Sequence, residues 1–183
     1  MDGNMGTNDK SEESGSRMEG TVTVEQGISL NSFEEFYNAK RPHLVRTLVI
    51  VLGNRELGIE AADEAMTRAY QRWSDVQAYD NPGGWVYRVA MNWAHSKLRR
   101  SKRELPSIYV TDKPHIEDPQ FEPKLDAALA SLPEKYRAPV VLRYYMDWSM
   151  EEISESLGIP KGTVKSRIHR GVAALQKSLG EAT

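Results

Sequence analysis

The spacing of apolar positions along the chain predicts helices, and no alternating pattern is long enough for a strand. Between Glu60 and Trp73, apolar residues recur every three or four positions. They are Ala62, Ala65, Met66, Ala69, Tyr70 and Trp73. The positions between them are polar or charged: Asp63, Glu64, Thr67, Arg68, Gln71 and Arg72. This separation predicts an amphipathic helix with one face in a core and the other in solvent.

Capping signals mark where the helices of the first half begin. Ser32 followed by Glu35 is the pattern of a capping box and predicts a helix start, with Pro42 expected to kink or interrupt that helix. A turn-like segment, residues 74–80, leads to Asn81 and Pro82. Asparagine is a good N-cap and proline suits the first helical position, so we predict a long helix from Pro82 to Arg100 or beyond.

The second half carries the pattern of a helix-turn-helix. Helices are predicted at residues 124–130 and 134–146, with Pro139 delaying or kinking the second. Ser149 and Glu152 form another capping box at the start of a short helix, and Gly158 suits the left-handed position after its end. A last helix is predicted from Lys161 to Leu179, joined to the short one by a tight turn.

The last helix separates apolar from polar and basic residues. Its apolar face consists of Val164, Ile168, Val172, Leu175 and Leu179. The predicted DNA-binding residues lie on its other faces: Lys161, Thr163, Lys165, Ser166, Arg167, His169 and Arg170. Small residues early in a helix can reach base edges in a major groove while cations contact phosphates. Charge alone leaves open an ordinary surface helix with a solvated basic face; the capped helix and glycine turn before it favour DNA.

Composition divides the chain into four segments. Residues 1–30 are acidic, rich in Gly, Ser, Thr, Asn and Glu and nearly free of large apolar residues, which predicts a disordered tail. Residues 105–122, with the prolines at 106, 114 and 119, predict an extended linker. The expected fold is therefore all-α, with two small helical domains at 31–104 and 123–183 joined by a flexible linker, the second containing the helix-turn-helix.

The charge distribution points to nucleic acid, although the formal net charge is −2. Residues 88–103 contain six Lys or Arg and no acid, and residues 158–179 contain five and no acid. Two local basic surfaces on an acidic protein fit a DNA-binding protein that also has a protein partner.

The first of these basic stretches also contains aromatic residues. Trp85, Tyr87 and Trp93 lie among cations, and single-stranded nucleic acid binds by stacking its bases on such rings while cations neutralise its backbone. The apolar neighbours of Trp85 favour a place in the core. For Tyr87 and Trp93 a core position and a base-stacking position remain equally open.

Enzyme, metal and membrane functions lack support in the sequence. The chain has no cysteine, and its four histidines are scattered without metal-ligand spacing, so we expect no metal site and no cofactor. Adjacent acids such as Glu151 and Glu152 are explained by helix capping, and we predict that the chain is not an enzyme. No apolar run approaches the roughly 20 residues of a membrane span, and no export signal is present. We therefore expect a cytoplasmic protein without direct membrane insertion.

Two sets of residues together resemble the extracytoplasmic-function (ECF) family of bacterial RNA polymerase sigma factors. The C-terminal set is Leu132-Pro133, Arg137, Leu142-Arg143, Trp148-Ser149, Glu152-Ile153, Leu157-Gly158, residues 162–167 and Arg170. The N-terminal set is Asp63-Glu64-Ala65, Arg68-Ala69, Arg72-Trp73, Asn81-Pro82, residues 85–90 and Asn92. The two sets occur in the order expected for the family and cover roughly residues 32–179.

The resemblance implies a function and roles for these residues. A sigma factor of this family binds core RNA polymerase and promoter DNA, directs initiation and is commonly held inactive by an anti-sigma factor. The last helix would read the minus-thirty-five element as duplex. The minus-ten element would be opened and read by Tyr79, Asp80, Asn81, Tyr87, Arg88, Asn92, Trp93, His95, Lys97, Arg99 and Arg100. The polymerase would contact Asp63, Glu64, Thr67, Arg68, Gln71 and Arg72.

Two other interpretations compete with this one. The chain could be a helix-turn-helix transcriptional regulator that is not a sigma subunit, or an RNA-processing or base-modifying enzyme that uses the aromatic helix. The first would show a sensor or dimerisation element, and the second a catalytic set. We also hypothesise that the acidic tail lies over a basic surface and weakens non-specific DNA binding by the free protein.

Overall fold

A computed structural model describes residues 23–104 and 123–180, and all regular secondary structure in these stretches is helical. The helices are α1 (Thr23–Leu52), α2 (Arg55–Gln71), α3 (Trp73–Val76), α4 (Pro82–Glu104), α5 (Pro123–Ser131), α6 (Glu134–Tyr144), α7 (Met150–Leu157) and α8 (Lys161–Gly180). This confirms the predicted all-α class. The prediction of a disordered tail is wrong for residues 23–30, which belong to α1; the rest of the tail and the whole predicted linker lie outside the described residues.

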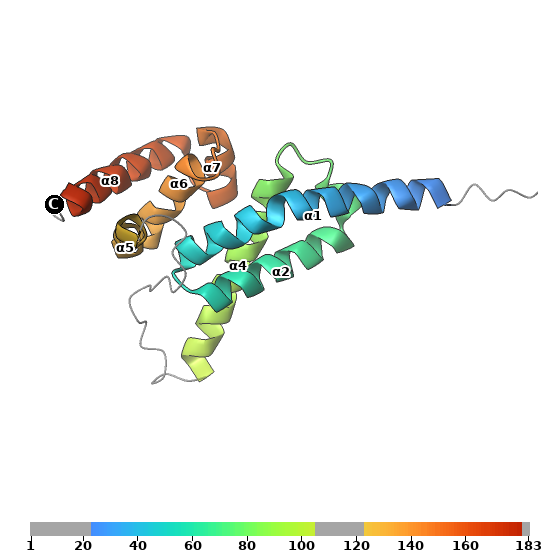
Figure 1. The fold of residues 1–183 in the computed structure, drawn as a ribbon, viewed down its shortest axis with the longest axis horizontal. Helices are drawn as coiled ribbons and strands as arrows, with labels where there is room; N and C mark the ends of the chain where they lie inside the picture. Colours follow the sequence, from blue (N-terminus) through green and yellow to red (C-terminus); the bar gives the residue numbers. More distant parts are fainter. Residues whose placement is uncertain (1–22, 105–122, 181–183) are drawn as a thin grey trace, which may run out of the picture.

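Helices α1, α2 and α4 form the first half of the molecule. The C-terminal part of α1 and α2 lie side by side and antiparallel, and α4 crosses them (Figure 1). The apolar face of α2 is rich in alanine, and Ala61, Ala65 and Ala69 are fully buried. Small side chains allow α1 and α4 to approach α2 closely, which places Leu48 and Ile50 in a dense core.

The first helix begins earlier than its capping pattern predicts. It starts at Thr23, so Ser32 and Glu35 lie inside α1, and the predicted start at Ser32 is wrong. The Ser-x-x-Glu pattern is compatible with a helix interior, because both residues tolerate helical geometry when no stop signal precedes them. Pro42 does not interrupt α1. It removes one backbone donor, but the apolar residues that follow anchor the helix in the core.

The next helix boundaries depend on local caps. Gly53 has a φ of 65° at the end of α1, and Asn54 then caps α2 by accepting a hydrogen bond from the Leu57 amide at 2.8 Å. The predicted start of α2 at Glu60 is therefore late and its predicted end at Trp73 is two residues beyond Gln71. Helix α3 begins at Trp73 and covers the first part of the segment predicted as a loop. The predicted cap of α4 is confirmed, because Asn81 Oδ1 accepts from the Gly84 amide at 2.7 Å.

The second half confirms the predicted helix-turn-helix. The Ser149 hydroxyl and the Glu152 carboxylate form both bonds of the capping box at the start of α7. Gly158 has a φ of 64°, the left-handed conformation that glycine adopts without strain, and α8 begins three residues later. Pro139 lies inside α6, which nevertheless begins at Glu134 as predicted.

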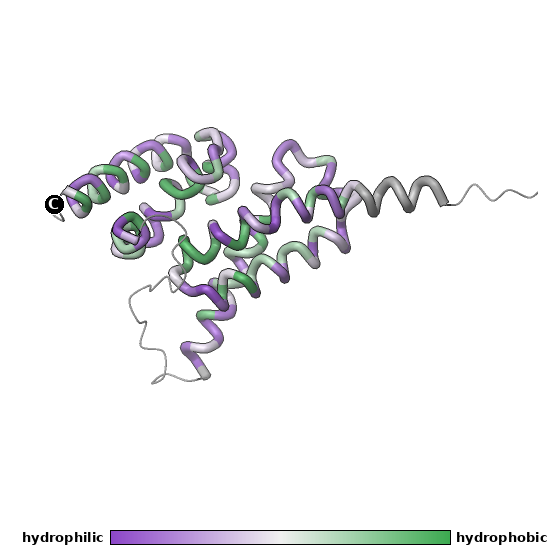
Figure 2. The backbone as a smooth tube through the Cα atoms, in the orientation of Figure 1, coloured by the Kyte–Doolittle hydropathy of each residue, from purple (hydrophilic) through white to green (hydrophobic). Residues whose placement is uncertain are grey.

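The two halves share one continuous apolar core. Helix α1 packs against α5 and α6, and α4 packs against α7 (Figure 1). The hydropathy colouring shows apolar segments of α1 and α6 on this inner side, while the C-terminal end of α4 is strongly polar (Figure 2). The buried cluster includes Tyr87 and Val86 of α4 together with Leu142 and Trp148 of the second half.

Candidate nucleic-acid interface

Helix α8 presents a polar and basic face to solvent because its apolar face is held by α6. Val164, Ile168 and Leu175 are buried. Gly171 permits the close approach of α6, since a Cβ there would lie 2.6 Å from Val140 Cγ2 and 3.2 Å from the Tyr136 carbonyl oxygen. The apolar face that the sequence predicts for this helix is therefore the buried one.

The predicted DNA-binding residues of α8 differ in whether they contact other helices. Lys165, Ser166, His169 and Arg170 are exposed along the outer face. Lys161 is also exposed, but its ammonium pairs with Glu151 at the start of α7. The hydrogen bond with Lys161 lowers the pKa of Glu151, and a hydrogen bond with Arg170 lowers the pKa of Tyr136 in α6.

Helix α4 carries the second set of predicted DNA-binding residues along its length. The exposed ones are Arg88, Asn92, Lys97, Arg99 and Arg100, and the half-buried ones are Trp93 and His95. The Lys97 ammonium lies 5.1 Å from the centre of the Trp93 ring and pairs with Glu60 of α2. This half of α4 thus combines a half-buried aromatic ring with cations, the kind of arrangement that suits unstacked bases and a phosphate backbone.

Tyr87 occupies the core rather than the surface. Its side chain is fully buried and meets the Trp148 ring edge-on, with centroids 5.8 Å apart. Burial raises the pKa of its hydroxyl. Of the two positions left open by the sequence, Tyr87 therefore takes the core position in this structure, and Trp93 takes an intermediate one.

The loop before α4 forms one wall of a pocket of about 380 Å³. Its lining is Tyr79, Asp80, Asn81, Gly84, Trp85 and Arg88, with Glu155 and Ser156 of α7 on the other wall. Tyr79 is exposed, and its ring lies 6.3 Å from that of Trp85. An aromatic wall next to polar loop atoms and an arginine can hold a flat, polar group such as a nucleobase.

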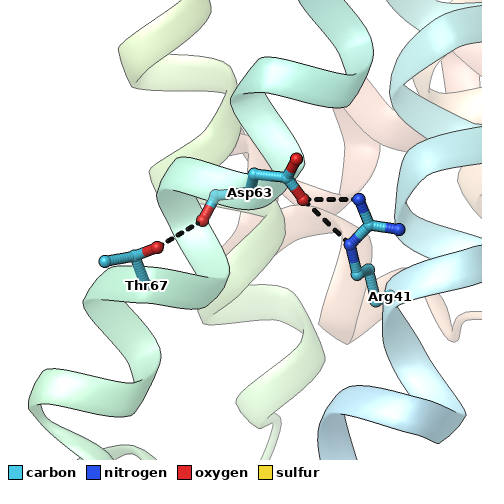
Figure 3. Close-up of polar contacts among 3 residues, drawn as sticks. All are labelled: Arg41, Asp63 and Thr67. Carbon is cyan, nitrogen blue, oxygen red and sulfur yellow. Dashed lines mark hydrogen bonds and ion pairs between the residues drawn. The ribbon is translucent and has the colours of Figure 1, made fainter.

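The polar face of α2 contains the residues predicted to contact polymerase. Asp63 accepts two hydrogen bonds from the Arg41 guanidinium of α1, from Nε at 2.8 Å and Nη2 at 2.6 Å, while the Thr67 hydroxyl donates to the Asp63 carbonyl oxygen (Figure 3). Glu64 pairs with Arg68 one turn later. Acidic and basic side chains therefore pair along this exposed face.

A shallow groove of about 420 Å³ lies beside this charged network, between α1 and α2. Phe33, Tyr37, Met66 and Tyr70 line it together with Arg41, Asp63 and Thr67. Tyr70 is 52% exposed, so its predicted place on the buried face is wrong. The row of apolar residues on α2 continues beyond the part that packs against α1 and α4. The sequence pattern does not show where this packing ends.

Residues 23–104 and 123–180 contain neither a metal-binding cluster nor a membrane-spanning helix. No cluster of three or more His, Asp or Glu side chains there is able to hold a metal ion. Every helix in these stretches is too short or too polar to cross a lipid bilayer.

Comparison with known proteins identifies the family. The model of the family described as Sigma-70, region 4 matches residues 123–175. The ECF RNA polymerase sigma factor SigW of Bacillus subtilis is 30% identical over 167 residues, which covers 81% of this chain and 89% of SigW. This chain belongs to the ECF family of RNA polymerase sigma factors.

Other relatives of this sigma factor agree. The RNA polymerase sigma-E factor of Streptomyces antibioticus is 31% identical over 80% of the chain and 84% of its own length. The ECF sigma factor SigE of Mycolicibacterium smegmatis is 33% identical over 84% of the chain, which spans 63% of SigE. The fold is similar to that of the sigma factor RpoE from Bartonella quintana, solved with the anti-sigma factor NepR: the TM-score is 0.72 at 19% identity, over 82% of this chain and 98% of that one.

The contacts between the halves of this sigma factor include residues that sequence reasoning did not single out. Gly84 faces Ser156, Gly83 lies near Trp148, and His95 bonds to Glu134 at 2.9 Å. Glu152, which the sequence marks as a capping residue, also accepts a hydrogen bond from Asn81 Nδ2 at 3.2 Å. These contacts join residues that are far apart in the chain, and without an alignment no local pattern marks them.

Proposed function

We propose that this sigma factor binds core RNA polymerase, directs it to specific promoters and helps to melt the minus-ten element. The observation that carries the proposal is the presence of two separate basic surfaces in an ECF sigma factor. One is the outer face of α8 in a helix-turn-helix, and the other is the aromatic and basic face of α4. A duplex-reading helix and a strand-binding helix in one chain fit promoter recognition better than single-site DNA binding.

In this proposal α8 reads the minus-thirty-five element as duplex. Its first turns offer small polar side chains such as Ser166, which leave room for close approach to base edges. Arg170 and Lys165 are both exposed and supply bidentate or phosphate contacts. The residues proposed to contact DNA are Lys161, Thr163, Lys165, Ser166, Arg167, His169 and Arg170.

Helix α4 and the loop before it bind the minus-ten element as a single strand. Trp93 is half-buried with the Lys97 ammonium over its ring, and Arg99 and Arg100 extend the cationic surface along the helix. The pocket beside Tyr79 and Trp85 holds an unstacked base. The remaining proposed contacts are those of Asp80, Asn81, Arg88, Asn92 and His95. Tyr87 is not among them, because its side chain is buried in the core.

The charged face of α2 docks on the polymerase. The paired side chains of Asp63 with Arg41 and of Glu64 with Arg68 are held in place before binding, which lowers the entropy lost on association. The proposed contacts are Asp63, Glu64, Thr67, Arg68, Gln71 and Arg72. An anti-sigma factor that covers either basic surface or this face would hold the chain inactive.

We further propose that residues 31–104 and 123–183 act as two domains joined by residues 105–122, and that the chain acts without catalytic residues or a cofactor of its own. The family relationship supports this division, since the Sigma-70, region 4 model matches within the second segment.

Reconstitution with core polymerase tests the function. The purified chain is mixed with core enzyme from its source bacterium and resolved by size exclusion, and the complex then transcribes a library of genomic fragments. We expect co-elution and discrete start sites that core enzyme alone does not produce. Binding to duplex DNA without co-elution or start sites would instead favour a helix-turn-helix regulator that is not a sigma subunit.

A further inference from the structure

Tyr136 lies in the first turn of α6, where this helix packs against the middle of α8. A Cβ built on Gly171 of α8 would lie 3.2 Å from the carbonyl oxygen of Tyr136 and 3.6 Å from its Cβ. Gly171 is buried at this crossing, and the residue before it is Arg170, one of the proposed minus-thirty-five contacts. The packing of α6 on α8 therefore holds Tyr136 beside Arg170.

Two cations meet at the Tyr136 side chain. The Lys135 ammonium lies 5.0 Å from the centre of its ring, and the Arg170 guanidinium shares a hydrogen bond with its hydroxyl. A guanidinium only donates, so the phenol oxygen is the acceptor. The hydrogen bond with Arg170 and the charge of Lys135 lower the pKa of Tyr136. The phenol is thus a polar partner for Arg170 that comes from a different helix.

The partner of Arg170 is neutral, unlike that of Lys161 at the start of the same helix. Lys161 pairs with the carboxylate of Glu151, which offsets its charge. Arg170 forms no ion pair with a carboxylate of the described residues, and Glu134, the acid nearest to Tyr136 in the chain, bonds to His95 instead. A phenol orients a guanidinium without cancelling its charge, so Arg170 keeps its full attraction for DNA.

The geometry of a guanidinium allows Arg170 to bind Tyr136 and DNA together. It carries five N–H donors in a planar fork, and one bond to a phenol oxygen leaves the others for DNA. A bidentate contact with the edge of a guanine uses two of them. Arg170 is exposed, and an arginine that is free to rotate loses side-chain entropy when it is fixed on DNA. A hydrogen bond already formed in the free protein lowers that loss.

From these contacts we infer that Tyr136 is a positioning residue for DNA reading: it holds the Arg170 guanidinium in the orientation in which α8 contacts the minus-thirty-five duplex. This inference rests on the proposed function. It adds a residue of α6, outside the helix-turn-helix, to the residues that determine which upstream sequence the sigma factor prefers.

Removal of one hydroxyl tests the inference. Tyr136→Phe keeps the ring and the packing of α6 on α8, and Tyr144→Phe removes a hydroxyl from the same helix at a position that is 68% exposed. Holoenzymes are titrated on the upstream duplex of a promoter found by reconstituted transcription. We expect Tyr136→Phe to lose about three- to tenfold in affinity, as for one net hydrogen bond, and Tyr144→Phe to match the wild type. Unchanged affinity would overturn the inference, and higher affinity would show that Tyr136 withholds Arg170 from DNA.

A double-mutant cycle separates positioning from a structural role. In an Arg170→Ala background, Tyr136→Phe should have no further effect, because the side chain that it positions is absent. Base-pair substitutions along the upstream element supply a second readout. Tyr136→Phe should lose discrimination at the same base pair as Arg170→Ala and keep it at the others. An equal loss with and without Arg170, or a uniform loss over all base pairs, would overturn the inference, as would full upstream affinity of Arg170→Ala.

NMR relaxation of the Arg170 side chain needs no promoter. We expect its Nε–H order parameter in the free chain to fall in Tyr136→Phe and to stay at the wild-type value in Tyr144→Phe. Equal values in all three chains, with normal transcription by the wild type, would overturn the inference and leave the proposed function standing. No start sites from the wild-type chain with core enzyme would overturn the proposed function, and with it any role of Tyr136 in promoter reading, even if Arg170 were restrained as expected.

Discussion

Single atoms set how closely the helices of this sigma factor pack, and Gly171 is the clearest case. In α8 it leaves no room for a methyl group, because the nearest atoms belong to a stiff buried valine and to a backbone carbonyl. We expect Gly171→Ala to lower the free energy of unfolding by about 1–2 kcal/mol, since overpacking outweighs the gain in helix propensity. Urea unfolding measures the change.

Gly162 of the same helix is the matched control for this substitution. No atom lies within 4 Å of a Cβ built there. Gly162→Ala should therefore leave stability unchanged or raise it by up to about 1 kcal/mol. Equal effects of the two substitutions would show that α6 and α8 are not in close contact.

The pKa of His95 depends on a contact between the two halves. Its hydrogen bond to Glu134 raises the pKa of His95, opposed by partial burial and by Arg99; Arg88 and Lys135 line the same cleft. A raised pKa means that the protonated form is favoured in the folded structure. The contribution of this pair is therefore complete below the ordinary pKa of histidine, at pH values where Glu134 is ionised, and it is lost as pH rises through the raised pKa of His95.

Titration of His95 by NMR tests this assignment. We expect its pKa to lie above the ordinary histidine value in the full chain and to fall towards that value in Glu134→Gln. The control Glu155→Gln removes an acid of α7 that does not bond to His95, and it should leave the titration in place. An ordinary pKa in the wild-type chain would contradict the contact.

At the scale of whole helices, we expect the exposed face of α2 to bind core polymerase. We predict that Glu64→Lys with Arg72→Glu weakens binding to core polymerase while circular dichroism shows unchanged helix content. Both side chains lie on the surface, so the free energy of unfolding should change by no more than about 0.5 kcal/mol for each. Undiminished affinity in a polymerase pull-down would remove α2 from the proposed interface.

Helix boundaries show which local signals the sequence carries reliably. Asn81 and Ser149 were predicted as caps and are caps, because each directly precedes a helix and follows a segment that breaks one. Ser32 has a similar pattern and is not a cap, since the helix before it has no stop signal. A capping motif marks a start only where the preceding residues cannot continue the helix.

The arrangement of the two halves was beyond reach of the sequence. Periodicity correctly placed the inner faces of α2 and α8, but each face is a property of one helix. Burial of Tyr87 depends on Trp148, and the second role of Glu152 depends on Asn81; both are contacts between distant segments. No single-helix pattern distinguishes a solvent-facing side chain from one that another domain covers.

At the scale of the whole molecule, the acidic N-terminal segment remains a prediction. Residues 1–30, the predicted tail, contain six acids and two cations, and residues 1–22 of this segment lie outside the described residues. If they compete with phosphate for a basic surface, their removal should tighten non-specific DNA binding, more strongly at low salt. A filter-binding titration of both chains at two salt concentrations measures this, and equal affinities at both would exclude an electrostatic role.

The central claim is that α8 binds upstream duplex DNA and α4 binds the minus-ten single strand. Footprinting on one promoter tests this claim most directly. Holoenzymes with the wild-type chain, Arg170→Ala and Trp93→Ala are compared for protection of the upstream duplex and for permanganate reactivity of the minus-ten strand. Arg170→Ala should weaken upstream binding by about 1–3 kcal/mol. Trp93→Ala should keep upstream protection and lose permanganate reactivity. The same defect for both variants in both assays would contradict two separate surfaces.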